Sequence, residues 1–375
     1  MELSTEEKKQ YQRHISLPSF GLEGQKLLKK ASVLVIGAGG LGCPVLQYLT
    51  AAGVGTIGIV DEDLIESSNL QRQVLYSQSD TGGFKVEVAA QKLEQLNPFI
   101  KINPHVIRFN ADNAESLLQG YDIVVDGTDN FASRYLINDA CVLFNKVLIY
   151  GAIYQFEGQV SVFNFKNGPT YRCLFPYPSK SNPLANCSEV GVLGVLPGII
   201  GNFQALEVIK VITGLGEPLT GKVLLYDALN QKTRIIGINP IPKNREVKNL
   251  SDVFFNCPTN KNNITDQMII EIEPIEFSEL MENENDLVVL DVREDWERKV
   301  SKITPSTHIP LGDFSSPSGP DLPNEISVDK KIVIYCKAGV RSRMACEALK
   351  EKGFKNLLNL SGGILQWEAE GFPIT

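Results

Sequence analysis

A glycine-rich turn, Gly37-Ala-Gly39-Gly40-Leu-Gly42, sets the fold of the first part of the chain. The apolar run 33–37 before it is typical of a buried strand, and the stretch after it suits a helix. A second apolar run, 57–61, follows at the spacing of the next strand. The pattern therefore predicts a strand, turn, helix and strand in which glycines let the backbone approach a phosphate at a helix N-terminus.

The same alternation continues through the first two thirds of the chain. The strand-like runs are 33–37, 57–61, 102–106, 122–126 and 147–150, and the helical stretches between them include 81–96 and 131–144. This alternation predicts an α/β fold, a Rossmann-like mixed, mainly parallel sheet with helices on both faces. Three later runs, 159–164, 222–228 and 233–238, have less helix between them, and we expect them to extend the sheet in antiparallel fashion.

The chain divides near residue 248. Residues 1–248 hold 23 Lys+Arg against 23 Asp+Glu, whereas residues 249–375 hold 13 against 21, so the net charge of −8 belongs to the last third. A polar, Pro-bearing stretch surrounds this point. We therefore expect a domain over 1–239, a linker over 240–270 and a small α/β domain over 271–375. The acidic excess argues against a nucleic-acid partner.

Two features bear on where the protein works. The run 31–60 has no charged residue and is long enough to cross a bilayer, but seven glycines and Pro44 interrupt it, so we expect no membrane span. Seven cysteines in 375 residues are too sparse for a disulfide framework, and the charged N-terminus lacks a signal-peptide core. We therefore expect a cytoplasmic protein.

Asp61, 24 residues after Gly37, suits a carboxylate on a ribose hydroxyl, which fits NAD and ATP equally well. Further polar residues favour a triphosphate. They are Asp63, the run Ser68–Gln73, Lys85, and Asp129 within Asp126-Gly-Thr-Asp-Asn130, with Arg134 one turn later. Attack at phosphorus needs positive charge on the transferring group and on the leaving pyrophosphate, for which hydride transfer has no use.

Together with Tyr11-Gln-Arg13-His14, these motifs resemble the ThiF/MoeB/HesA-type adenylyltransferases, bacterial relatives of ubiquitin-activating enzymes. The resemblance covers about residues 5–238 and implies ATP and Mg²⁺ in the first domain, with Asp129 on the metal. It implies as nucleotide contacts Gly37, Gly39, Gly40, Gly42, Asp61, Asp63, Ser68, Asn69, Leu70, Gln71, Arg72, Gln73, Lys85, Asp129 and Asn130. Arg13 resembles an arginine that such dimers extend into the partner's site, which implies an obligatory homodimer.

Cys187 lies in a polar segment before a Gly-rich helix start. A lone cysteine is more often a small buried hydrophobe than a nucleophile. The family resemblance alone implies that this thiol accepts an acyl or persulfide-linked intermediate. Cys43, Cys141 and Cys346 stand at apolar helical positions, and we expect them to pack in the core.

Cys336 lies in Tyr335-Cys-Lys-Ala-Gly-Val-Arg341, between a strand and a helix start. Backbone N–H groups, Lys337 and Arg341 all favour a thiolate there and suit an anionic persulfide sulfur. A Cys-based phosphatase is the alternative, but its loop places five residues between Cys and Arg, whereas this loop has four. With Leu290–Glu294 upstream and Gly362–Trp367 downstream, residues 272–375 resemble a rhodanese domain.

The sequence departs from its relatives at one place. Such proteins usually hold a structural zinc with two CxxC pairs, but here the first pair reads Thr170 and Cys173, and 238–250 contains no cysteine. Since a four-coordinate zinc site needs four ligands, we predict that zinc is absent. We expect apolar contacts to hold the segment 165–190 instead, from Phe163, Phe165, Leu174, Phe175 and Tyr177.

The resemblance implies that the protein adenylates the C-terminal Gly-Gly carboxylate of a ThiS- or MoaD-like sulfur carrier. A Cys336 persulfide, loaded by a cysteine desulfurase or another donor, then gives a thiocarboxylate. The expected catalytic residues are Arg13, Arg72, Lys85, Asp129, Cys187, Cys336 and Arg341. Two alternatives stay open: an NAD-binding, redox-linked protein, and an adenylyltransferase whose rhodanese domain only recruits partners. The sequence does not distinguish molybdopterin, thiamine and tRNA-thiolation pathways.

Overall fold

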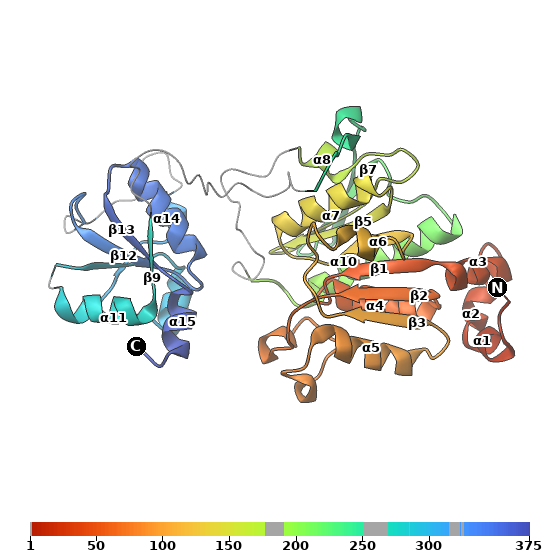
Figure 1. The fold of residues 1–375 in the computed structure, drawn as a ribbon, viewed down its shortest axis with the longest axis horizontal. Helices are drawn as coiled ribbons and strands as arrows, with labels where there is room; N and C mark the ends of the chain where they lie inside the picture. The colour runs from red at the N-terminus through yellow and green to blue at the C-terminus, as the bar shows by residue number, and fades with distance from the viewer. Residues whose placement is uncertain (1, 177–190, 251–268, 285, 315–322, 324–325) are drawn as a thin grey trace. The chain divides into compact units, whose positions relative to one another are not determined.

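The chain forms two compact units, with the boundary between Cys257 and Pro258. The computed structural model describes residues 2–176, 191–250, 269–284, 286–314, 323 and 326–375. Each unit has its own sheet and its own core, so each is described by itself (Figure 1).

The first unit contains an eight-stranded sheet in the order β3-β2-β1-β4-β5-β6-β7-β8. The strands are β1 (Ser32–Ile36), β2 (Thr56–Val60), β3 (Lys101–His105), β4 (Ile123–Asp126), β5 (Val147–Tyr154), β6 (Glu157–Phe163), β7 (Lys222–Asp227) and β8 (Lys232–Gly237). The pairs from β3 to β5 are parallel and those from β5 to β8 antiparallel, which confirms the mixed, mainly parallel sheet. Strand order reverses between β1 and β4, where open α/β sheets bind ligands at the carboxyl ends of the strands.

Helices cover both faces of this sheet. They are α1 (Thr5–Gln10), α2 (Gln12–Ile15), α3 (Gly21–Lys30), α4 (Gly42–Ala52), α5 (Lys85–Leu96), α6 (Ala114–Leu118), α7 (Phe131–Leu143), α8 (Tyr171–Leu174) and α10 (Val195–Thr213). Alternate residues of β1 point to different cores: Val33 and Val35 pack with α4, α5 and α10, whereas Leu34 and Ile36 pack with α6 and α7. A strand buried on both faces reads as one continuous apolar run, which is why the sequence locates it.

Helix α10 is long and apolar enough to span a bilayer, and it is the one such helix among the described residues. It packs on α4, β5 and β6 as a core helix of the first unit. Gly201 allows the close approach to α4, because a Cβ there would lie 2.6 Å from the carbonyl oxygen of Leu41.

The second unit contains a five-stranded parallel sheet in the order β11-β10-β12-β13-β9. Its elements are β9 (Ile270–Ile272), α11 (Pro274–Asn283), β10 (Val288–Asp291), α12 (Asp295–Val300), β11 (Thr307–His308), α13 (Leu311–Phe314), β12 (Lys331–Tyr335), α14 (Val340–Glu351), β13 (Asn356–Leu360) and α15 (Gly363–Ala369). Apolar clusters on both faces of the sheet confirm a small α/β domain.

Part of the segment expected as a linker contacts the first unit. Leu250 is buried there, the Asn244 side chain donates to the carbonyl oxygen of Arg172 at 2.9 Å, and Arg245 donates to that of Gly168. Residues 251–268 lie outside the described residues, so a linker over that stretch stays a prediction.

Candidate functional site

The glycine turn lies at the carboxyl ends of β1, β2 and β4. Gly37 has φ +96° and donates to the carbonyl oxygen of Val60 at 2.8 Å. A Cβ at Gly37 would lie 2.7 Å from the carbonyl oxygen of Gly127, and one at Gly42 would lie 2.0 Å from that of Gly37. These two glycines therefore let the turn close against the loop after β4. In contrast, a Cβ at Gly39 would meet only the Gln73 side chain within 4 Å, so this part of the turn can face a ligand.

Asp61, Asp63 and Lys85 form a charged cluster beside the turn. Asp61 accepts hydrogen bonds from the backbone N–H of Ala38 at 2.8 Å and of Asp63 at 2.9 Å. The Lys85 ammonium, at the start of α5, lies 2.6 Å from the Asp63 carboxylate and 4.0 Å from that of Asp61. Burial raises the pKa of the Asp61 carboxyl, and the Lys85 charge opposes that rise. The cluster places one nearly buried cation where a phosphate would lie on the turn.

The segment Ser68–Gln73 brings a second cation to the turn. Arg72 donates to the carbonyl oxygen of Ser68 at 3.1 Å, and its side chain would lie 3.5 Å from a Cβ at Gly40. Gln73 is buried against Gly39, whereas Ser68 and Gln71 are exposed. Two other residues of Ser68–Gln73 stabilise the conformation of this segment. The Asn69 side chain accepts from the Glu66 backbone N–H at 3.2 Å, and Leu70 packs on the core.

The loop after β4 presents Asp129 next to the glycine turn. Buried Asp126 accepts from the Thr128 backbone N–H at 2.9 Å and from its hydroxyl at 2.6 Å, and Asn130 caps α7 by accepting from the Ser133 N–H at 2.9 Å. Burial raises the pKa of Asp126, and the Arg134 charge opposes that rise. Asp129 is exposed at the apex of the loop.

This arrangement fits Mg²⁺ bound with a nucleotide. Mg²⁺ commonly binds through one or two carboxylates together with substrate phosphates. The exposed carboxylate of Asp129 suits this mode of binding. Among the described residues, no three His, Cys, Asp or Glu side chains form a metal cage.

The chain's own site does not include Arg13. Neighbouring Tyr11 accepts a hydrogen bond from Asn97 at 2.8 Å, and a Cβ at Gly53 would lie 2.7 Å from the Tyr11 hydroxyl. Gly53 and Asn97 come directly after the C-terminal ends of α4 and α5, and both of these helices start at the site. Helix α2 therefore lies at the opposite edge of the sheet, where the parallel strands begin. Arg13 is exposed there.

Two contributions to the site come from α10 and were not predicted. Pro197 at the start of this helix would lie 3.1 Å from a Cβ at Gly40, and buried Gln204 donates to the carbonyl oxygen of Asp126 at 2.7 Å. The sequence carries one weak signal for this: Gln204 is one of the few polar residues in the largely apolar run 195–213.

Cys173, the remaining cysteine of the expected zinc-binding pair, collects several hydrogen bonds. Its sulfur accepts from the backbone N–H of Thr170 at 3.4 Å and of Ile241 at 3.3 Å, and from the Asn244 amide at 3.7 Å. Burial raises the pKa of the thiol, but these hydrogen bonds lower it more, so the net direction is downward. One thiol does not fit a four-ligand zinc site, and the absence of zinc stays a prediction.

Apolar side chains pack around residues 165–176, the described part of the segment for which such contacts were expected. Phe163, Phe165, Leu174 and Phe175 all join the cores of the first unit. Polar contacts add to them: Arg172 forms two hydrogen bonds to Asp139, at 2.7 and 2.6 Å. Tyr177 and Cys187 lie outside the described residues, so the expected role of Cys187 remains a prediction.

In the second unit, the Cys336 sulfur is buried inside its loop. It accepts from the backbone N–H of Gly339 at 3.1 Å and from the Ser342 hydroxyl at 3.4 Å. The Arg341 guanidinium forms two hydrogen bonds with Glu297, at 2.6 and 2.8 Å. Lys337 is half-buried. The loop thus offers donors to a sulfur anion at the start of α14.

The other expected core cysteines are confirmed. Cys43, Cys141 and Cys346 are all buried. Burial raises the pKa of Cys43 to about 12, and it raises those of Cys141 and Cys346 as well. These thiols therefore stay protonated at neutral pH and serve packing.

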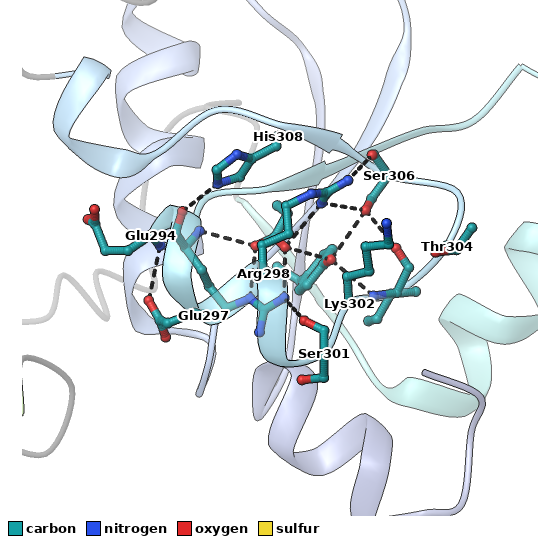
Figure 2. A network of polar contacts seen from close by, with 12 residues as sticks. Glu294, Glu297, Arg298, Ser301, Lys302, Thr304, Ser306 and His308 are labelled. Atoms are coloured by element: carbon teal, nitrogen blue, oxygen red, sulfur yellow. Dashed lines mark hydrogen bonds and ion pairs between the residues drawn. The ribbon is translucent and has the colours of Figure 1, made fainter. Parts of the chain in front are cut away.

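A buried polar network holds the segment between β10 and β11 (Figure 2). Asp291 accepts two hydrogen bonds from Arg293, at 2.9 and 2.8 Å, and one each from the Tyr335 hydroxyl at 2.8 Å and Arg298 at 3.2 Å. Arg298 also donates to Ser306. Burial raises the pKa of Asp291, but Arg293 and Tyr335 lower it more, so it lies below its usual value.

Because the folded-state pKa of Asp291 is lowered, its stabilising contribution is present above the unfolded pKa, near 4, and is lost as pH falls through the folded value. Asp291→Asn should lower the free energy of unfolding of this unit at neutral pH by about 3 kcal/mol. Both tryptophans of the chain, Trp296 and Trp367, belong to this unit, so urea titrations followed by tryptophan fluorescence measure it directly. An equal acid sensitivity in the wild type and the variant would contradict this role.

The two units define a class of enzyme, in which a doubly wound nucleotide-binding domain is joined to a small domain with a cysteine in an anion-binding loop. The chain belongs to the ThiF family, because residues 11–248 match the sequence model of that family. Residues 273–370 match the model of the rhodanese-like domain. It is therefore an adenylyltransferase and sulfurtransferase, as the resemblance predicted, and the NAD-dependent alternative is set aside.

Individual relatives agree. The chain is 42% identical to the probable adenylyltransferase/sulfurtransferase MoeZ of Mycobacterium tuberculosis, over 99% of this chain and 95% of that one. It is 50% identical to the sulfur carrier protein adenylyltransferase of Thermus thermophilus, over 65% of this chain and 92% of that one. The crystal structure of E. coli MccB with MccA-N7isoASN is similar with a TM-score of 0.56 and 25% identity, covering 64% of this chain and 74% of the other.

Proposed function

We propose that this protein uses Mg·ATP to activate the C-terminal Gly-Gly carboxylate of a small ubiquitin-like sulfur carrier and converts it to a thiocarboxylate with sulfur carried on Cys336. The observation that carries the proposal is that Lys85 and Arg72 lie beside a glycine turn, against which the loop that carries Asp129 closes through Gly127. The Thermus thermophilus relative, named as an adenylyltransferase of a sulfur carrier protein, supports this substrate class.

In the first step, a carboxylate oxygen of the carrier attacks the α-phosphorus of ATP, and pyrophosphate leaves with the electron pair of the broken bond. Lys85 and Arg72 neutralise negative charge that builds on the phosphates. To do so, Lys85 exchanges the Asp63 carboxylate for a phosphate oxygen. Asp129 would hold Mg²⁺, which supplies further positive charge to the triphosphate.

In the second step, the terminal sulfur of a Cys336 persulfide attacks the acyl carbon, and AMP leaves. The product is an acyl disulfide between the carrier and Cys336. A second thiolate, from Cys187 or an external thiol, then attacks the Cys336 sulfur, which releases the thiocarboxylate and forms a disulfide. The Gly339 N–H and the Ser342 hydroxyl support the loop sulfur during this exchange. A further external thiol then reduces this disulfide by exchange and frees the Cys336 thiolate, which a cysteine desulfurase or similar donor in the cytoplasm would reload with sulfur.

The proposal also includes a homodimer in which Arg13 serves the partner's site. Two observations support it: Arg13 lies at the edge of the sheet opposite its own glycine turn, and the apolar side chains of Val195 and Leu206 on α10 are exposed. Exposed apolar patches commonly mark interaction surfaces.

Mixing two inactive variants tests this arrangement. Arg13→Ala and Lys85→Met subunits, denatured together and refolded, should recover about a quarter of wild-type carrier-dependent ATP–pyrophosphate exchange, because half of the dimers then hold one complete site. Each variant refolded alone is the control. If Arg13 served its own subunit, the mixture would recover nothing.

The direct test of the proposed function follows pyrophosphate. Purified protein with Mg·ATP and a Gly-Gly-tailed carrier should release pyrophosphate, and a carrier truncated by its last two residues should not. NADH, added as a competitor, should leave the rate unchanged. Pyrophosphate release that ignored the carrier would contradict the proposal.

A further inference from the structure

We propose that Glu297 is a positioning residue for sulfur transfer, because it holds the guanidinium of Arg341 and thereby fixes the loop that carries Cys336. The inference rests on the proposed function of Cys336 as the sulfur carrier. Glu297 lies 44 residues before Arg341 in the sequence, on helix α12, and the fold brings their side chains together.

The contact between the two residues is close and nearly dry. The Arg341 Nη1 donates to Glu297 Oε2 at 2.6 Å and its Nη2 to Oε1 at 2.8 Å. The side chains are 13% and 7% exposed, so water screens the pair little. Bidentate pairs of this kind fix orientation as well as charge. Burial raises the pKa of Glu297, but the bonds from Arg341 and from the Glu294 backbone N–H lower it more, so the carboxylate is ionised at neutral pH.

Arg341 lies next to a residue that contacts the Cys336 sulfur. The next residue, Ser342, donates its hydroxyl to the Cys336 sulfur at 3.4 Å, and both residues lie in the first turn of α14. A shift of the Arg341 guanidinium therefore moves the start of this helix and the donors around the sulfur. Misplacement of reacting groups by about 1 Å can cost on the order of 100-fold in rate.

The opposite side of the loop is held by the backbone of α15 and by β13. The N–H of Ile364 donates to the carbonyl oxygen of Cys336 at 2.9 Å, and the N–H of Leu365 to that of Lys337 at 3.1 Å. The Asn359 amide donates to the carbonyl oxygen of Gly339 at 2.9 Å. These bonds position the loop from one side, and Glu297 positions it from α12.

Helix α12 is itself anchored, which makes it a firm support for Glu297. Figure 2 shows Arg298 of this helix bound to Ser306, and Glu297 beside Glu294 at the helix start. Arg298 also reaches Asp291, and Arg293 donates to the carbonyl oxygen of Ser301 at 2.8 Å. The buried network and the cysteine loop are thus joined through Glu297.

The full-length chain tests the inference with thiosulfate as sulfur donor and cyanide as acceptor. Glu297→Gln keeps the side-chain shape but removes its charge, and we expect kcat to fall on the order of 100-fold while KM for thiosulfate stays within about threefold. Glu297→Asp, which keeps the charge, should recover part of the loss. Asp295→Asn is the matched control, since this carboxylate is exposed on the same helix. It should leave both constants unchanged.

A second variant separates positioning from folding. In an Arg341→Ala background, Glu297→Gln should cost less than about threefold, because the partner through which it acts is already gone. Tryptophan fluorescence gives the folded fraction of every variant. The inference would be overturned if the losses in kcat of the two single variants multiplied in the double variant. It would also be overturned if the fall in kcat of Glu297→Gln were fully explained by a smaller fraction of folded protein.

The same assays keep the two proposals apart. If the wild type and Cys336→Ala transferred sulfur equally well, the proposed function of Cys336 would fail. If the wild type were active through Cys336 and Glu297→Gln were equally active, only the positioning role of Glu297 would fail.

Discussion

Cys336→Ala should abolish thiocarboxylate formation and leave carrier-dependent ATP–pyrophosphate exchange at the wild-type rate. The two steps belong to two compact units with separate cores, and the Cys336 sulfur is enclosed in the second of them. Removing a nucleophile typically costs several orders of magnitude in rate, far more than any loss of packing would. Carrier thiocarboxylate, separated by reversed-phase chromatography, and exchange of labelled pyrophosphate are the two measurements.

A second buried cysteine of the same unit supplies the control. Cys346 belongs to α14 and its side chain is buried in the core, and Cys346→Ala should form thiocarboxylate nearly as well as the wild type. If the rhodanese-like domain only recruited partners, Cys336→Ala would be as active as this control. That outcome would end the proposed role of Cys336.

Lys85→Met should slow carrier-dependent exchange by a few hundredfold, or about 3–4 kcal/mol in the barrier. The variant keeps the length of the side chain but removes the positive charge that lies beside Asp61 and Asp63. The wild-type ammonium is only 7% exposed, so water does little to replace it. Steady-state exchange at saturating Mg·ATP and carrier measures the effect.

Lys92→Met is the matched control for this variant. Lys92 lies two turns later on the same helix and also pairs with an aspartate, Asp80, away from the glycine turn. Its loss should leave exchange unchanged. Equal effects of the two substitutions would mean that Lys85 acts on stability and not on the phosphates.

The sequence predicted the sheet of the first unit well, because strands buried on both faces are continuous apolar runs. It placed the first strand at 33–37, and the structure has Ser32–Ile36. It stopped the fifth strand at 150, whereas β5 continues to Tyr154. Pairing with β4 ends at Tyr150, and residues 151–154 continue the strand through their pairing with β6. Gly151, which is unfavourable within strands, interrupts the sequence signal at this point.

Much of the candidate site was predictable for a related reason. The carboxyl ends of parallel strands meet at one edge, so Asp61 and Asp129 could be placed beside the glycine turn from the order of motifs alone. The contributions of Gln204 and Glu297 could not, because both act across long sequence separations. Gln204 reaches the end of β4, and Glu297 reaches Arg341, through the packing of α10 and α12. The spacing of residues in the sequence does not predict such packing.

The claim on which everything depends is that this chain replaces oxygen by sulfur at the carrier's terminal carboxylate. Intact-protein mass spectrometry of a Gly-Gly-tailed carrier, incubated with the enzyme, Mg·ATP, a persulfide donor and a reducing thiol, tests it most directly. We expect a mass gain equal to the exchange of one oxygen for one sulfur, absent when ATP or the donor is omitted. A carrier whose mass never changes, while ATP is cleaved and every component is intact, would contradict the account.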